Sequence, residues 1–115
     1  MPEKRRKVVW APKSKQDLRE VWRYYARVAS PDIADKLLRE IDQAGEQLAE
    51  QALMWRARDE VMPGLRSVLV RPHTVFYRVQ NGVVEIARVL HERRNFPEIF
   101  SKEKREDEAK SGNAL

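Results

Sequence analysis

The fold is decided by residues 74–91, which read TVFYRVQNGVVEIARVLH. Two runs rich in valine, isoleucine and aromatic residues, Thr74–Gln80 and Val83–His91, are separated only by Asn81-Gly82. Such runs on both sides of Asn-Gly predict a β-hairpin, because both central positions of a type I′ turn require positive φ. We therefore expect these two runs to pair as antiparallel strands.

A two-residue turn also fixes which residues face each other across the hairpin. It predicts the pairs Tyr77–Ile86, Phe76–Ala87 and Val75–Arg88, and a cross-strand ion pair between Arg78 and Glu85 worth ~0.2–1 kcal/mol. One face then carries Val75, Tyr77, Val79, Val84 and Ile86, and the other carries Phe76, Arg78, Gln80 and Glu85. We expect the first face to pack on helices and the second, more polar face to be available.

Two amphipathic helices precede the hairpin. Apolar residues recur every three or four positions over residues 14–29 and again over residues 31–51, which predicts a helical hairpin. Ser14, followed three residues later by Asp17, is interpreted as the start of the first helix. Ser30-Pro31 breaks the periodicity and is expected to cap the second helix.

The whole chain is therefore predicted to be an α+β domain. A short N-terminal strand at residues 8–10 leads into the helical hairpin, and Leu65–Arg71 precedes the two hairpin strands as the first strand of a three-stranded antiparallel meander. A short C-terminal helix follows, capped by Asn95. By this division residues 1–7 are a basic arm, residues 8–100 a single domain, and residues 101–115 a charged, mobile tail.

Composition excludes several kinds of function. The chain has 115 residues, no cysteine and only two histidines, so we expect neither a thiolate zinc site nor a histidine-based metal site, and no cofactor. No apolar run approaches the ~20 residues that a membrane span requires, and no signal-peptide pattern opens the chain. A cytoplasmic location is the simplest expectation.

Arginine is concentrated in the second half of the chain. The net charge is +5, and residues 56–94 contain eight arginines and no lysine. The planar guanidinium fork suits carboxylates and phosphates. A candidate site combines Arg66, Arg88, His91, Arg93 and Arg94. The histidine could be a general acid or base acting on a phosphodiester, or it could simply end a strand while the arginines bind a partner's carboxylates.

Several motifs resemble the ParE branch of the RelE/ParE toxins. They are WAP at 10–12, DLxxVWxY at 17–24, SP at 30–31, PGLRS at 63–67, VFYRV at 75–79 and VEIxRVLHxRR at 84–94. The resemblance implies the toxin half of a type II toxin–antitoxin pair, inhibited by a ParD-like antitoxin whose acidic segment folds on binding. ParE members poison DNA gyrase, whereas RelE members cut messenger RNA on the ribosome. Operator DNA would be bound only through the antitoxin.

The two branches differ in residues of the sheet. Ribonuclease members typically carry a basic residue where this chain has Thr74, and here the acidic Glu92 follows His91. The resemblance therefore favours a gyrase-binding toxin without catalytic residues. Its implied target-binding residues are Arg66, Arg88, His91, Arg93 and Arg94. A ribonuclease using Arg66 and His91 is the alternative, and a non-toxic nucleic-acid-binding module is a second one.

The antitoxin is expected to cover part of the helical hairpin and the sheet. The candidate contacts are Trp22, Tyr25, Trp55 and Arg78. Members of the family often have a proline and a glycine near the positions of Ala52 and Trp55. Because this chain departs from that pattern, the resemblance does not determine the shape of this loop. Trp55 could be an exposed anchor for a partner or a lid over the core.

Overall fold

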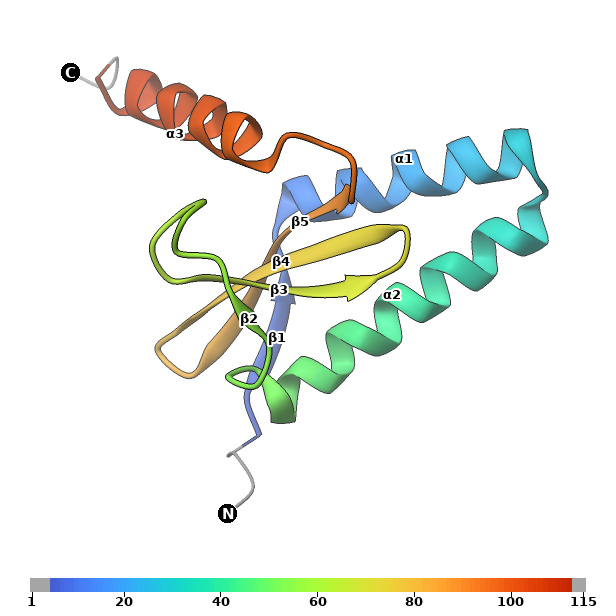
Figure 1. Cartoon of the computed structure of the whole chain (residues 1–115), viewed down its shortest axis with the longest axis horizontal. Helices are drawn as coiled ribbons and strands as arrows, with labels where there is room; N and C mark the ends of the chain where they lie inside the picture. The colour runs from blue at the N-terminus through green and yellow to red at the C-terminus, as the bar shows by residue number, and fades with distance from the viewer. Residues whose placement is uncertain (1–4, 113–115) are drawn as a thin grey trace.

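A computed structural model describes residues 5–112, with side chains for residues 5–106. The elements are β1 (Lys7–Trp10), α1 (Pro12–Val28), α2 (Pro31–Gln51), β2 (Arg56–Ala57), β3 (Leu65–Val70), β4 (His73–Gln80), β5 (Val83–His91) and α3 (Phe96–Gly112). The strands form one sheet in the order β1-β5-β4-β3-β2 (Figure 1). The α+β class is confirmed. The meander is extended by β1, which is parallel to β5, and by the unpredicted β2.

The β4–β5 hairpin has the predicted turn but only part of the predicted register. Asn81 and Gly82 have φ values of 53° and 74°, and Tyr77 pairs with Ile86 as expected. A bulge between Phe76 and Tyr77 then shifts the pairing by one residue. Phe76 faces Arg88 rather than Ala87, and Val75 faces Val89 rather than Arg88. The predicted pairs beyond Tyr77 were wrong because a β-bulge inserts an extra residue on one strand.

The helical hairpin is confirmed, but its first helix begins earlier than predicted. Pro12 opens α1, and the hydroxyl of Ser14 donates to the carbonyl of Ala11 at 2.6 Å instead of capping the helix. Ser14 is fully buried. In α2 the prediction holds, since the Ser30 side chain accepts a hydrogen bond from the Ile33 N–H at 3.2 Å.

One face of the sheet packs against α2. Its core contains Ile41 and Leu48 from α2 and the predicted inward residues of the hairpin, including Tyr77 and Ile86. Gly45 allows close packing here: a Cβ at this position would lie 2.6 Å from the Trp10 ring. This tight contact explains why a glycine occupies the middle of a helix.

The other face of the sheet is covered near α3, contrary to the prediction that it would be available. Phe76 is fully buried there, and Phe100 of α3 packs against it with ring centroids 5.1 Å apart. Leu65 and Leu90 complete this second core. The polar end of the face, with Arg78 and its neighbours, lies outside this cluster because α3 covers only part of the sheet.

The predicted ends of the domain differ from the observed elements. The Asn95 side chain accepts a hydrogen bond from the Glu98 N–H, as expected of a cap, but α3 runs to Gly112 and crosses the boundary placed after residue 100. Arg5 pairs with Glu50, and Lys7 begins β1. Residues 1–4 of the predicted arm and 113–115 of the predicted tail lie outside the described residues. Within residues 5–112, no helix is both long enough and apolar enough to cross a membrane.

Candidate functional site

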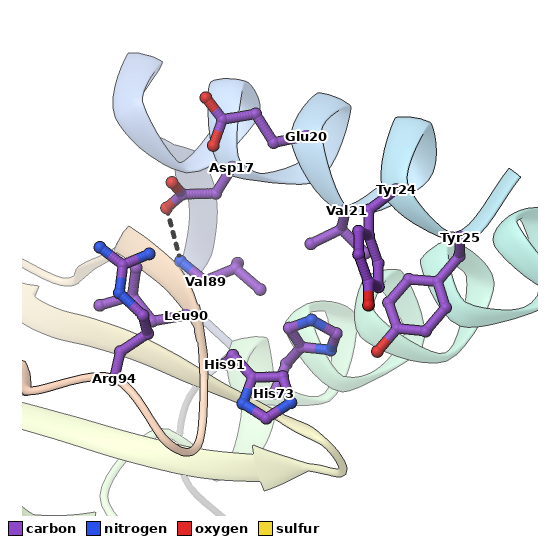
Figure 2. A pocket seen from close by; sticks show the side chains of 10 residues that line it. All are labelled: Asp17, Glu20, Val21, Tyr24, Tyr25, His73, Val89, Leu90, His91 and Arg94. Carbon is purple, nitrogen blue, oxygen red and sulfur yellow. Dashed lines mark hydrogen bonds between the residues drawn. The ribbon is translucent and has the colours of Figure 1, made fainter. Parts of the chain in front are cut away.

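A pocket of about 340 Å³ lies between α1 and the end of β5 (Figure 2). Its lining residues are Asp17, Glu20, Val21, Tyr24, Tyr25, His73, Val89, Leu90, His91 and Arg94. The pocket brings together two sets of residues that the sequence kept apart: His91 and Arg94 as target contacts and Tyr25 as an antitoxin contact. Tyr24 and His73 were not predicted.

Two histidines and a tyrosine form an aromatic row in this pocket. His73 and His91 are cross-strand partners with ring centroids 5.7 Å apart, and Tyr25 lies 6.0 Å from His73 (Figure 2). The Nδ1 atom of His91 accepts a hydrogen bond from the Arg93 N–H at 3.1 Å. His73 is buried, and its Nδ1 has no hydrogen-bond partner among the described residues. Extending the predicted hairpin register would have placed His73 opposite Leu90, and the bulge between Phe76 and Tyr77 brings it opposite His91 instead.

The environment of His73 favours its neutral form. Burial lowers the pKa of the imidazole below its ordinary value of 6.5, and the charge of His91 lowers it further. The Glu92 carboxylate has an opposing effect on this pKa. Tyr25, His73 and His91 therefore give the pocket an aromatic floor, while Asp17, Glu20 and Arg94 are the charged residues of its lining. Such a pocket can accept an apolar or aromatic side chain of a protein partner.

His73 is predicted to make the stability of the fold depend on pH. The unfolded chain takes up a proton on His73 near pH 6.5, whereas the folded chain resists protonation until a lower pH. The free energy of unfolding should therefore fall as the pH drops below about 6.5, and this effect should stop below the folded pKa. Urea unfolding at several pH values should show a smaller fall for His73→Phe than for the wild type. Equal pH dependence in the two proteins would contradict the prediction.

Arg88 is part of a buried ion network rather than the pocket. Its Nε and Nη2 atoms donate to the carboxylate of Asp17 at 2.8 and 2.9 Å, and its Nη1 contacts Glu103 of α3. These contacts, led by the hydrogen bond to Asp17, raise the pKa of Arg88. Asp17 also accepts a hydrogen bond from the Val89 N–H at 2.9 Å. Arg88 therefore connects α1, β5 and α3, and its guanidinium is engaged by carboxylates of the same chain.

Arg66 holds the loop that follows α2. One of its terminal nitrogens donates to the carbonyls of Leu53 and Trp55 at 3.2 and 2.8 Å. Beside it, the hydroxyl of Tyr77 donates to the carbonyl of Ala52 at 2.5 Å. The two side chains together fix the backbone of residues 52–55, the loop whose shape the sequence left open.

Arg66 and His91 are not brought together. Arg66 pairs with Tyr77, whereas His91 pairs with His73, four residues away along β4. At the usual rise of a strand this separation is about 13 Å. A phosphate held by Arg66 would thus lie out of reach of the His91 ring, because general acid–base catalysis requires hydrogen-bond distance.

The four predicted antitoxin contacts lie on different surfaces. Trp22 turns toward α2, where its indole N–H donates to Asp35 at 2.8 Å, while Tyr25 turns into the pocket. Trp55 packs half-buried against the core, as a lid would, and its N–H has no partner among the described side chains. Arg78 forms the predicted ion pair with Glu85 at 2.9 Å. Of these four residues, only Tyr25 lines the pocket.

Arg93 and Arg94 remain as exposed cations beside the pocket. Both side chains are exposed in the turn after β5, and neither makes an ion pair with any carboxylate that the structure describes. Their backbone N–H groups donate to Nδ1 and the carbonyl oxygen of His91, respectively. The turn is thus fixed by its backbone, and both guanidinium groups stay available to a partner.

Comparisons with known proteins agree on one family. The model of the "ParE toxin of type II toxin-antitoxin system, parDE" matches residues 8–96. Toxin ParE1 of Mycobacterium tuberculosis (strain H37Rv) is 36% identical over 84 residues, covering 72% of this chain and 86% of the relative. Toxin ParE1 of Caulobacter vibrioides is also 36% identical over 84 residues, covering 72% and 85%.

Solved structures support the same fold. The chromosomal ParDE toxin–antitoxin system from P. aeruginosa includes a chain that superimposes with a TM-score of 0.69 at 22% identity, covering 77% of this chain and 98% of that one. The RelBE2 toxin–antitoxin complex from Mycobacterium tuberculosis gives a TM-score of 0.53 at 21% identity, covering 76% and 98%. The family match ends at Phe96, the first residue of α3.

Proposed function

Because the chain belongs to the ParE toxin family of type II toxin–antitoxin systems, we propose that it arrests growth by binding DNA gyrase and that a cognate antitoxin neutralises it. It would act in the cytoplasm, where gyrase works on the chromosome. The family alone does not decide between binding and catalysis. That choice depends on how the candidate residues are arranged.

The separation of Arg66 and His91 is the observation that favours binding. A ribonuclease would need the histidine and a phosphate-holding cation at one place, but the partners of these two residues lie four positions apart along β4. Arg66 is moreover engaged with the backbone of residues 52–55. The exposed Arg93 and Arg94 next to the aromatic pocket are better suited to holding a protein surface.

The proposed antitoxin is ParD-like, with an acidic segment that orders when it binds. The pocket offers Tyr24 and Tyr25 for apolar contacts and Arg94 for a carboxylate. Tyr24 is half-exposed, at 50%, so a partner could still bury considerable aromatic surface there. Segments of this kind pay an ordering cost that apolar burial must offset. Competition between antitoxin and gyrase for this pocket would explain neutralisation.

Supercoiling by purified gyrase is the direct test of the proposed function. Relaxed plasmid is incubated with gyrase and ATP, with and without the protein, and both supercoiling and linearised plasmid are scored. Inhibition with accumulation of cleaved DNA, reversed by the antitoxin, is the expected result. No effect at a large molar excess would contradict it. Messenger RNA cleavage in a translation extract, lost in His91→Ala, would then favour the ribonuclease alternative.

A further inference from the structure

Helix α1 carries a regular row of basic side chains on its outer surface. Lys15, Arg19, Arg23 and Arg27 are spaced four residues apart, and all four are exposed. Residues four apart lie on one side of a helix. The row therefore runs along the side of α1 that faces away from the buried Ser14 and Val21. At 1.5 Å per residue it is about 18 Å long.

The four charges are not neutralised within the described part of the chain. None of them forms an ion pair with a carboxylate there, whereas Lys13 of the same helix pairs with Glu103 and Glu106. Arg27 lies over the ring of Tyr24, at 5.9 Å from its centroid, which leaves its N–H donors unused. Four like charges along one surface repel each other, and a polyanion would relieve that repulsion.

Protein partners and nucleic acids make different demands on such a surface. A protein interface needs an apolar centre. The apolar Leu18 and Trp22 of α1 are only partly exposed and line a groove with Leu38 of α2, beside Arg19 and Arg23, so the exposed side chains of the row itself are all basic. A nucleic-acid backbone is bound chiefly by basic side chains that neutralise phosphates. One strand of B-DNA presents a phosphate every 3.4 Å of helix axis, so a row of about 18 Å spans about five phosphates.

We propose that Lys15, Arg19, Arg23 and Arg27 form a binding site for the phosphate backbone of double-stranded DNA. This inference goes beyond the proposed function, since it assigns the toxin a direct DNA contact of its own. On a gyrase–DNA complex, α1 would bind the DNA while Arg93, Arg94 and the pocket bind the protein. Lys15, Arg19 and Arg23 do not line the pocket, and Arg27 borders it through its contact with Tyr24. The proposed DNA site therefore lies next to the pocket.

The test measures binding of the full-length protein to a fluorescein-labelled random-sequence duplex, by anisotropy at several salt concentrations and without gyrase. If all four side chains bind phosphates, log K should fall with log salt with a slope of about −3 to −4. The variant K15Q/R19Q/R23Q/R27Q should lose most of this slope and about 10²- to 10³-fold in affinity near 0.1 M salt. The double variant R19Q/R23Q should lose about half of the slope.

A matched control removes the same net charge elsewhere. The variant K36Q/R39Q/R56Q/R71Q alters four exposed residues outside α1 and should keep nearly all of the slope. Equal losses in the two quadruple variants, or no salt-dependent binding by the wild type, would overturn the proposal. Tighter binding to duplex RNA of the same sequence would also overturn it. So would displacement of the duplex by poly-L-glutamate as effectively, charge for charge, as by unlabelled DNA.

Discussion

Replacing Asp17 with alanine is expected to lower the free energy of unfolding by about 3–5 kcal/mol. The carboxylate is buried and accepts three hydrogen bonds, two from the Arg88 guanidinium and one from the Val89 N–H. Without it, the guanidinium stays largely buried with Glu103 as its remaining anion, and the Val89 N–H loses its acceptor. The loss is a large fraction of the ~5–15 kcal/mol that stabilises a typical domain.

Urea unfolding monitored by circular dichroism measures this effect. Glu20→Ala is the matched control, because Glu20 is an exposed carboxylate one turn further along α1, and it should change stability by no more than about 0.5 kcal/mol. The double variant Asp17→Ala/Arg88→Met should recover part of the loss, since it also removes the unpaired charge. A cost below about 1 kcal/mol for Asp17→Ala would show that the network contributes little.

Reversing the charges of Arg93 and Arg94 is expected to abolish growth arrest on expression. Placing two carboxylates against an anionic target surface costs several kcal/mol, which corresponds to more than about 100-fold in affinity. The fold should be unaffected, because both side chains are exposed. The hydrogen bonds of this turn come from the backbone N–H groups, which the substitutions keep.

Growth after induction, combined with gyrase supercoiling in vitro, is the measurement. Lys102→Glu/Lys104→Glu makes the same charge change on the exposed side of α3 and should remain toxic. Circular dichroism must match the wild type for both variants. Retained toxicity of a folded Arg93→Glu/Arg94→Glu variant would exclude these arginines from the target interface.

The extent of α3 could not be predicted from local sequence. Residues after Phe100 are charged and lack an apolar stripe, so they were expected to form a mobile tail. In the structure α3 continues to Gly112, with Phe96 and Phe100 packed on Phe76 and Glu103 in contact with Arg88. The helix thus depends on partners that are distant in the sequence. The family match, which stops at Phe96, contains no information on it.

The sequence by itself determined the elements whose signals are local. Asn81-Gly82 specifies the turn because two consecutive positive φ angles are needed there. Ser30-Pro31 specifies the start of α2 because the serine side chain caps a free N–H of the first turn. The ion pair of Arg78 with Glu85 follows from the turn register. The motifs of residues 10–94 also indicated the family, because they occur along this chain in the order that resembles ParE toxins.

Only the tertiary structure decided which of the candidate residues act together. Sequence proximity grouped Arg88 with His91, but α1 supplies Asp17, which holds Arg88 in an internal network. Arg66 and His91 looked like one site, but the sheet register separates them. The pocket joins α1 to the ends of two strands, and a bulge helps set which β5 residues line it. Such contacts depend on register and packing between distant segments, which local propensity does not encode.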